Sequence, residues 1–97
     1  MNLEEFKSGL QNTSPPSGLN RYLLALWHDR MGNWQLSHEI VQDIDTQNAS
    51  WIHAYLHRKE GDKSNALYWY TKAGKNMPDY SLEKEWEDIV RSNLEQL

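Results

Sequence analysis

The segment that decides the fold is Ala25-Leu26-Trp27-His28-Asp29-Arg30-Met31-Gly32-Asn33, which is repeated with changes as Ala54-Tyr55-Leu56-His57-Arg58-Lys59-Glu60-Gly61-Asp62. Both copies carry alanine, histidine and glycine at matching positions, a basic residue at the sixth position, and asparagine or aspartate at the ninth. The copies are offset by 29 residues, the distance in sequence from Gly32 to Gly61. A unit repeated at a spacing of about 20 to 50 residues is typical of solenoids built from helix hairpins.

The end of each copy carries the signals that close one helix and open the next. Gly32 and Gly61 can adopt the left-handed backbone conformation that ends a helix. Asn33 and Asp62 follow directly, and their side chains can accept hydrogen bonds from the free amides of a new helix. We therefore expect a helix hairpin around each glycine.

Apolar residues recur with helical spacing along the whole chain, and no segment alternates with the period of a strand. Leu19, Tyr22, Leu23 and Leu26, for example, follow the i, i+3, i+4, i+7 pattern. The pattern predicts an all-α protein with helices near residues 3–11, 16–31, 34–45, 49–60, 63–75 and 81–96.

These helices predict a single domain, residues 1–97, made of two stacked antiparallel hairpins with a helix at each end. By residue number, hairpin one covers about 16–45, hairpin two about 49–76 and the last helix about 81–96. The first helix is expected to form a polar cap. The last helix should cap the second hairpin, with Trp86, Ile89 and Val90 facing inward.

Composition excludes several classes of protein. The chain has 97 residues and no cysteine, so it has no disulfide framework, no thiolate metal site and no cysteine nucleophile. Ten Lys and Arg against fourteen Asp and Glu give a net charge of −4, which argues against a nucleic-acid partner. No segment predicts a membrane span or a signal peptide, so we expect a cytoplasmic protein without a membrane partner. Five Trp and five Tyr predict a small core built from large rings.

The second hairpin carries residues that resemble a tetratricopeptide repeat, including its Sel1-like relatives. The matching residues are Gly61-Asp62, Ala66, Trp69-Tyr70, Lys72-Ala73 and Pro78. Gly32-Asn33-Trp34 begins a degenerate first copy, and the resemblance covers about residues 19–78. The run from His53 to Asp62 also resembles a set of small uncharacterised bacterial proteins.

The tetratricopeptide resemblance implies a non-catalytic module that binds a peptide, a protein or a small ligand on its concave face. The residues expected on this binding face are Trp51, His53, Tyr55, His57, Arg58, Lys59 and His28. The alternative for the aromatic residues is that Trp51 and Tyr55 pack beneath the first hairpin. No motif of a catalytic site is present, so we expect no enzyme activity.

Histidines suggest an alternative function, a metal- or small-ligand-binding protein centred on His28, His53 and His57. His53 and His57 lie four residues apart on one helix face, and His28 is the repeat equivalent of His57. The competing interpretation is that these are core histidines bonded to backbone carbonyls, Asp29 or Glu60. Because the pair lacks a third ligand at a firm spacing, we expect no stoichiometric metal and no cofactor.

A basic stretch lies in the second half of the chain and consists of Arg58, Lys59, Lys63, Lys72 and Lys75. It could bind a carboxylate or phosphate group. The alternative is an internal match to acidic residues of the last helix, namely Glu83, Glu85, Glu87 and Asp88. For the assembly we expect a monomer, or else a two-fold dimer around Tyr22, Leu26 and Trp34.

Overall fold

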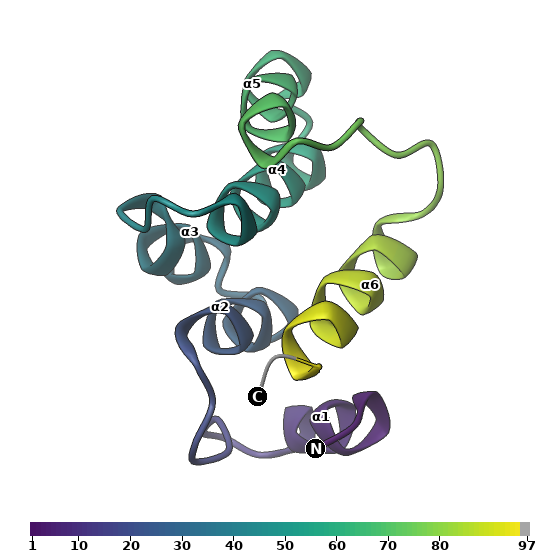
Figure 1. Cartoon of the computed structure of the whole chain (residues 1–97). Helices are drawn as coiled ribbons and strands as arrows, with labels where there is room; N and C mark the ends of the chain where they lie inside the picture. The colour runs from purple at the N-terminus through teal and green to yellow at the C-terminus, as the bar shows by residue number, and fades with distance from the viewer. Residues whose placement is uncertain (96–97) are drawn as a thin grey trace.

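Six α-helices and one short 3-10 helix make up the part of the chain that the computed structural model describes, residues 1–95 (Figure 1). In chain order they are α1 (Leu3–Ser8), η1 (Gly9–Gln11), α2 (Arg21–Arg30), α3 (Trp34–Gln42), α4 (Gln47–Glu60), α5 (Lys63–Ala73) and α6 (Leu82–Leu94). Residues 1–95 contain no strand, so the all-α prediction is confirmed. No helix in this range combines the length and the apolar character that crossing a membrane requires.

The two sequence copies form the same turn. Gly32 and Gly61 have φ angles of +87° and +90°, and each lies directly after the C-terminal turn of a helix. The next residues, Asn33 and Asp62, accept hydrogen bonds at 3.1 and 3.3 Å from the amide three residues further on. As a result α2 packs against α3 and α4 packs against α5, and the two hairpins meet where α3 packs against α4.

Helix boundaries agree with the prediction to within a few residues except at the start of α2. We expected a helix from residue 16, whereas α2 begins at Arg21. Gly18 has a φ of +84°, which a right-handed helix cannot contain. The side chain of Asn20 accepts from the Leu23 amide at 2.9 Å and caps the helix. The predicted last residue of the final helix, residue 96, lies outside the described part of the chain.

The last helix takes a different place from the one expected. Instead of covering the end of the second hairpin, α6 packs across both α2 and α4 and also against α1 (Figure 1). Trp86 is fully buried, and its indole Nε1 donates to the Leu26 carbonyl at 3.1 Å. Because the Trp86 side chain is large and apolar, its burial against α2 makes α6 part of the core.

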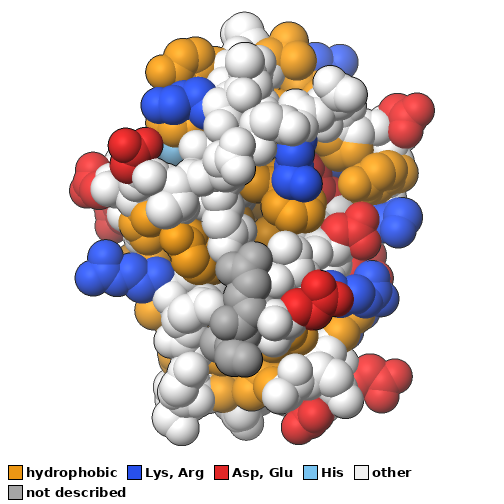
Figure 2. Space-filling model, in the orientation of Figure 1, with side chains coloured by type: hydrophobic (Ala, Val, Ile, Leu, Met, Phe, Trp, Pro, Cys, Tyr) orange, Lys and Arg blue, Asp and Glu red, His pale blue; other side chains and the backbone are white. Residues whose placement is uncertain are grey.

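The first helix is more than a polar cap, because it contributes to the core. Phe6 is fully buried and packs against Trp86, with ring centroids 5.8 Å apart. Trp27 of α2 donates from Nε1 to the Gly9 carbonyl at 3.1 Å, which ties the end of α1 to the first hairpin. Outside this core, hydrophobic and charged side chains alternate over the face drawn in Figure 2.

Candidate functional site

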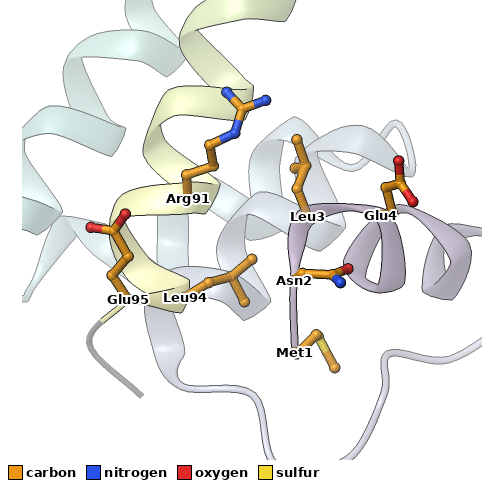
Figure 3. Close-up of a pocket in the computed structure, with 7 residues that line it drawn as sticks. All are labelled: Met1, Asn2, Leu3, Glu4, Arg91, Leu94 and Glu95. Carbon is orange, nitrogen blue, oxygen red and sulfur yellow. The ribbon is translucent and has the colours of Figure 1, made fainter.

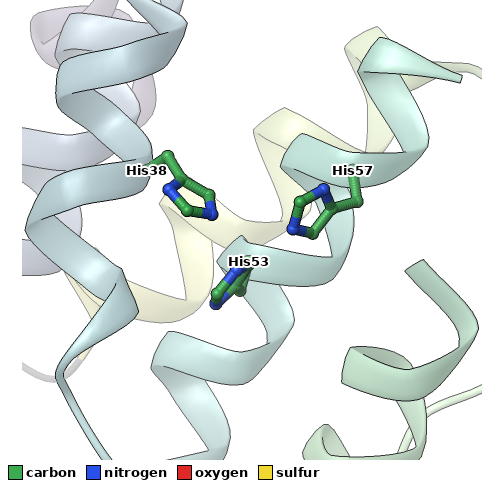
Figure 4. Close-up of side chains that lie close together, drawn as sticks. All are labelled: His38, His53 and His57. Carbon is green, nitrogen blue, oxygen red and sulfur yellow. The ribbon is translucent and has the colours of Figure 1, made fainter. Parts of the chain in front are cut away.

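Three histidines meet where α3 and α4 pack together. His38 comes from α3, and His53 and His57 come from successive turns of α4. Each offers one ring nitrogen, and these three atoms all lie within 4.8 Å of one another. Figure 4 shows the three rings around a common space. Two helices from different hairpins therefore build one cluster of potential ligands.

Tryptophans form the walls of this cluster. The His53 ring stacks on the Trp69 ring of α5, with centroids 3.8 Å apart and planes inclined by 13°. The His38 ring stacks in the same way on Trp34, with centroids 5.0 Å apart. A stacked imidazole presents its ring edge, where the nitrogens lie, to the space in front of it. The stacking therefore orients the rings without using their nitrogens.

One histidine is held by a carboxylate. His57 Nδ1 lies 2.6 Å from Glu60 Oε2, one helical turn further along α4. Histidines that bind metals commonly donate their second ring N–H to a carboxylate, which fixes the tautomer and the ring orientation. With Nδ1 engaged by Glu60, the Nε2 atom of His57 is the one left for a ligand.

Burial keeps the imidazoles of His53 and His38 neutral. Desolvation is the main cause that lowers the pKa of His53 to about 3, and the neighbouring His38 and His57 add to it. Desolvation, followed by the charge of His57, lowers the pKa of His38 as well. Among the hydrogen bonds of residues 1–95, none uses a ring nitrogen of His38 or His53. Their lone pairs are therefore free to coordinate a cation.

Three imidazoles without a thiolate form a donor set of intermediate softness. Zn²⁺, Cu²⁺ and Ni²⁺ accept such ligands, whereas Ca²⁺ and Mg²⁺ require oxygen ligands. Sites with three protein ligands leave a further coordination position for water or another ligand. The arrangement suits a divalent transition-metal ion.

The cluster differs from the predicted one in its third member. The repeat pairs His28 with His57, but His28 lies outside the group, with its ring against Trp27 at a centroid distance of 5.0 Å. The third histidine of the cluster is His38, which sequence reasoning did not include. It lies four residues after Trp34, one turn into α3, and only the packing of α3 on α4 brings it to the pair.

Two residues of the predicted binding face, Trp51 and Arg58, bond to α6. Glu85 of α6 is fully buried and accepts hydrogen bonds from Arg58 Nη1 at 2.8 Å and from Trp51 Nε1 at 3.1 Å. It also accepts from the hydroxyl of Tyr70 at 2.6 Å. The chain's own last helix therefore satisfies Trp51 and Arg58, and part of the predicted internal charge match is present in the Arg58–Glu85 pair.

Two further residues of the predicted binding face, Tyr55 and Lys59, bond to the first hairpin. Asp29 is buried and accepts from the Tyr55 hydroxyl and from Lys59 Nζ, each at 2.9 Å. Tyr55 is buried, as the packing alternative for this residue requires, whereas Lys59 is exposed. Of the seven predicted site residues, only His53 and His57 therefore come together with free ligand atoms.

A separate hollow of about 450 Å³ lies between the start of the chain and the end of α6 (Figure 3). Its lining residues are Met1, Asn2, Leu3, Glu4, Arg91, Leu94 and Glu95. None of them is a predicted site residue, and no histidine is among them. The candidate site is therefore the cluster of His38, His53 and His57.

No protein-family model matches the chain, and searches of curated proteins and of solved structures found no match either.

Proposed function

We propose that this protein is a non-catalytic helical module that binds a divalent transition-metal ion, of which Zn²⁺ is the representative, through His38, His53 and His57. The observation that supports it is the approach of three ring nitrogens to within 4.8 Å of one another. The tryptophans that stack on His53 and His38 and the carboxylate that holds His57 support the same function.

This proposal differs from the expectation, made from the sequence, that the protein binds no stoichiometric metal. That expectation depended on a pair of histidines without a third ligand, and His38 supplies the ligand. The binding of a peptide or protein to the predicted concave face stays a prediction. Such a partner would have to compete with α6, whose fully buried Glu85 accepts hydrogen bonds from Trp51 and Arg58.

Isothermal titration of tag-free, metal-stripped protein with ZnCl₂ tests the proposal. We expect saturable uptake of a single ion per chain, and a loss of that uptake in His38→Ala and in His53→Ala. His28→Ala is the matched control, because it removes the one histidine outside the cluster and should bind like the parent. Far-UV circular dichroism of each variant checks that the helices are intact.

Two results would contradict the proposal. The first is a parent protein that takes up neither Zn²⁺ nor Ni²⁺ nor Cu²⁺. The second is uptake that survives His38→Ala but is lost in His57→Ala. That pattern would place the ion on the neighbouring group of His57, Glu60 and Asp62, whose ligand atoms also lie within 4.8 Å of one another.

A further inference from the structure

A second hollow, of about 260 Å³, adjoins the histidine cluster where α4 lies between α3 and α5 (Figure 1). Two of its lining residues continue the helix faces that carry the histidines. Gln42 follows His38 by four residues on α3, and residues at this spacing share a helix face. Ser50 precedes His53 by three residues on α4 and shares its face in the same way. The second hollow therefore begins about one helical turn from the cluster.

An ion held by the cluster has room for a further ligand on the side of this hollow. His57 lies at the opposite end of the cluster, because it follows His53 by four residues whereas Ser50 precedes it by three. Trp69 joins the two spaces, since it stacks on His53 and also lines the second hollow. A tetrahedral ion with three protein ligands leaves its fourth position open.

Charged side chains of both signs line the second hollow without pairing. Asp43 and Asp45 come from the turn between α3 and α4, and Lys72 comes from α5. Lys72 lies close to the cluster, because its Nζ is 5.1 Å from the centre of the Trp69 ring that stacks on His53. None of the three charged residues belongs to an ion pair among residues 1–95. Each is therefore available to a ligand.

Ser50 adds a hydrogen-bond donor to this lining. The residue is only 6% exposed, yet it lines the second hollow. Its hydroxyl has no partner among the hydrogen bonds of residues 1–95, so it can donate to a group inside the hollow.

The size of the second hollow suits a short, linear molecule. Its volume is below the roughly 300 to 1,000 Å³ of pockets that take drug-sized ligands. Asp43 lies about 7.5 Å beyond His38 along the helix axis, because five residues at about 1.5 Å each separate them. An extended chain of six carbons with a terminal amine has about this length, since each bond is about 1.5 Å long. Ile44 and Trp69 provide apolar surface for the carbons.

We infer that the second hollow binds a small molecule with a carboxylate at one end and an ammonium group at the other, whose carboxylate completes the coordination of the metal ion. This inference rests on the proposed metal site and names the class of ligand at its open position. One carboxylate oxygen would bind the ion, and the other would accept from Lys72 and Ser50. The ammonium group would pair with Asp43 and Asp45.

Isothermal titration of the Zn²⁺-loaded protein with 6-aminohexanoate tests the inference. We expect saturable binding of a single molecule per chain. Hexanoate lacks the ammonium group and hexylamine lacks the carboxylate, and each should bind about tenfold or more weakly, because a lost hydrogen bond to a charged group costs at least this factor. The metal-free protein should bind 6-aminohexanoate more weakly by a similar factor.

Variants separate the two ends of the ligand. Lys72→Met should weaken the binding of 6-aminohexanoate and of hexanoate alike. The double variant Asp43→Asn, Asp45→Asn should bind the two compounds equally. Lys63→Met and Asp79→Asn are the matched controls, because both residues are exposed and neither lines the second hollow. All of these variants should still take up Zn²⁺, since none changes a proposed metal ligand.

Three results would overturn this inference and leave the metal site standing: no binding of 6-aminohexanoate to the Zn²⁺-loaded protein, equal binding with and without Zn²⁺, or binding that Lys72→Met leaves unchanged. A parent protein that takes up no metal ion would overturn both proposals, and the titration with ZnCl₂ shows this before any 6-aminohexanoate is added.

Discussion

Ser37 is a single residue whose replacement should stabilise the protein. Within residues 1–95 its Oγ is the only buried side-chain nitrogen or oxygen without a hydrogen-bond partner. Ala66, which is also fully buried, occupies the equivalent position of the second copy. We expect Ser37→Ala to raise the free energy of unfolding by about 1 kcal/mol, since the cost of desolvating the hydroxyl disappears.

Urea unfolding of the parent and the Ser37→Ala variant measures this difference. Ser92→Ala, at a half-buried serine of α6, reports how much of the gain comes from helix propensity. A loss of stability in Ser37→Ala would show that the hydroxyl has a partner in solution.

The buried hydrogen bond from Tyr70 to Glu85 makes the stability of the protein depend on pH above about pH 10. Its hydroxyl donates to Glu85, and burial, followed by this hydrogen bond, raises the pKa of Tyr70 well above its ordinary value of 10. The stabilisation is fully present below pH 10 and is lost as the pH rises toward the folded-state pKa, because only the unfolded chain releases the proton.

We therefore expect Tyr70→Phe to lower the free energy of unfolding by about 1.5 to 3 kcal/mol at neutral pH. Above pH 10 the difference in the free energy of unfolding between parent and variant should shrink by at most about 1.4 kcal/mol per pH unit. Thermal melts between pH 7 and 11 measure it, with Tyr68→Phe at an exposed tyrosine of the same helix as the control. A difference that stays constant across this range would mean that the Tyr70 hydroxyl ionises as easily in the folded protein as in the unfolded chain.

The candidate site could be predicted only in part from single residues. His53 and His57 follow from their spacing of four on one helix, which local geometry fixes. His38 could not be found in this way, because the repeat aligns it with the exposed Leu67 and gives it no histidine equivalent. Its role depends on how α3 lies on α4, and the sequence pattern of either helix carries no signal for that packing.

At the scale of the elements, helix ends were predictable because their signals are local. Gly61 ends α4 and Asp62 begins α5, as expected. The predicted start of α2 was wrong because the prolines upstream indicated an earlier start than the cap at Asn20. The place of α6 was not predictable from its amphipathic pattern. That pattern shows which face is buried but not against which helices, and the charge pattern indicated a match between Arg58 and Glu85 without indicating that Glu85 is fully buried.

The junction of α1 with the rest of the molecule depends on a glycine. A Cβ atom added at Gly9 would lie 2.7 Å from Pro16 Cγ, well inside van der Waals contact. We expect Gly9→Ala to lower the free energy of unfolding by about 1 to 3 kcal/mol through overpacking. Helix propensity alone would give the opposite sign, because alanine is favoured over glycine by about 1 kcal/mol.

A double-mutant cycle with Pro16→Ala isolates this contact. Pro16→Ala removes the atom that the new Cβ would meet, so Gly9→Ala should be much less costly in that background. Equal costs in both backgrounds would place the effect elsewhere, for example in the hydrogen bond from Trp27 to the Gly9 carbonyl.

At the scale of the whole molecule we expect a monomer. The residues named for a dimer have partners within the chain: Leu26 is fully buried, Trp34 Nε1 donates to the Leu56 carbonyl at 2.9 Å, and the Tyr22 hydroxyl lies 3.0 Å from the Thr46 hydroxyl. Light scattering after size exclusion at micromolar concentration should give the mass of a single chain. A dimeric mass that falls in Trp34→Ala would instead identify the first hairpin as an interface.

The contact between α1 and α6 determines how the chain folds. In an open array of repeats each unit touches only its neighbours, and unfolding can start at either end and spread. Here Lys7 pairs with Glu87, 80 positions later in the chain, and Phe6 packs on Trp86. The first hairpin cannot detach from α6 without breaking the contact of Trp86 with Leu26, and the second cannot detach without leaving the buried Glu85 unpaired, so the two hairpins are joined into a single cooperative unit. We expect such a unit to unfold in a single transition, rather than unit by unit from one end.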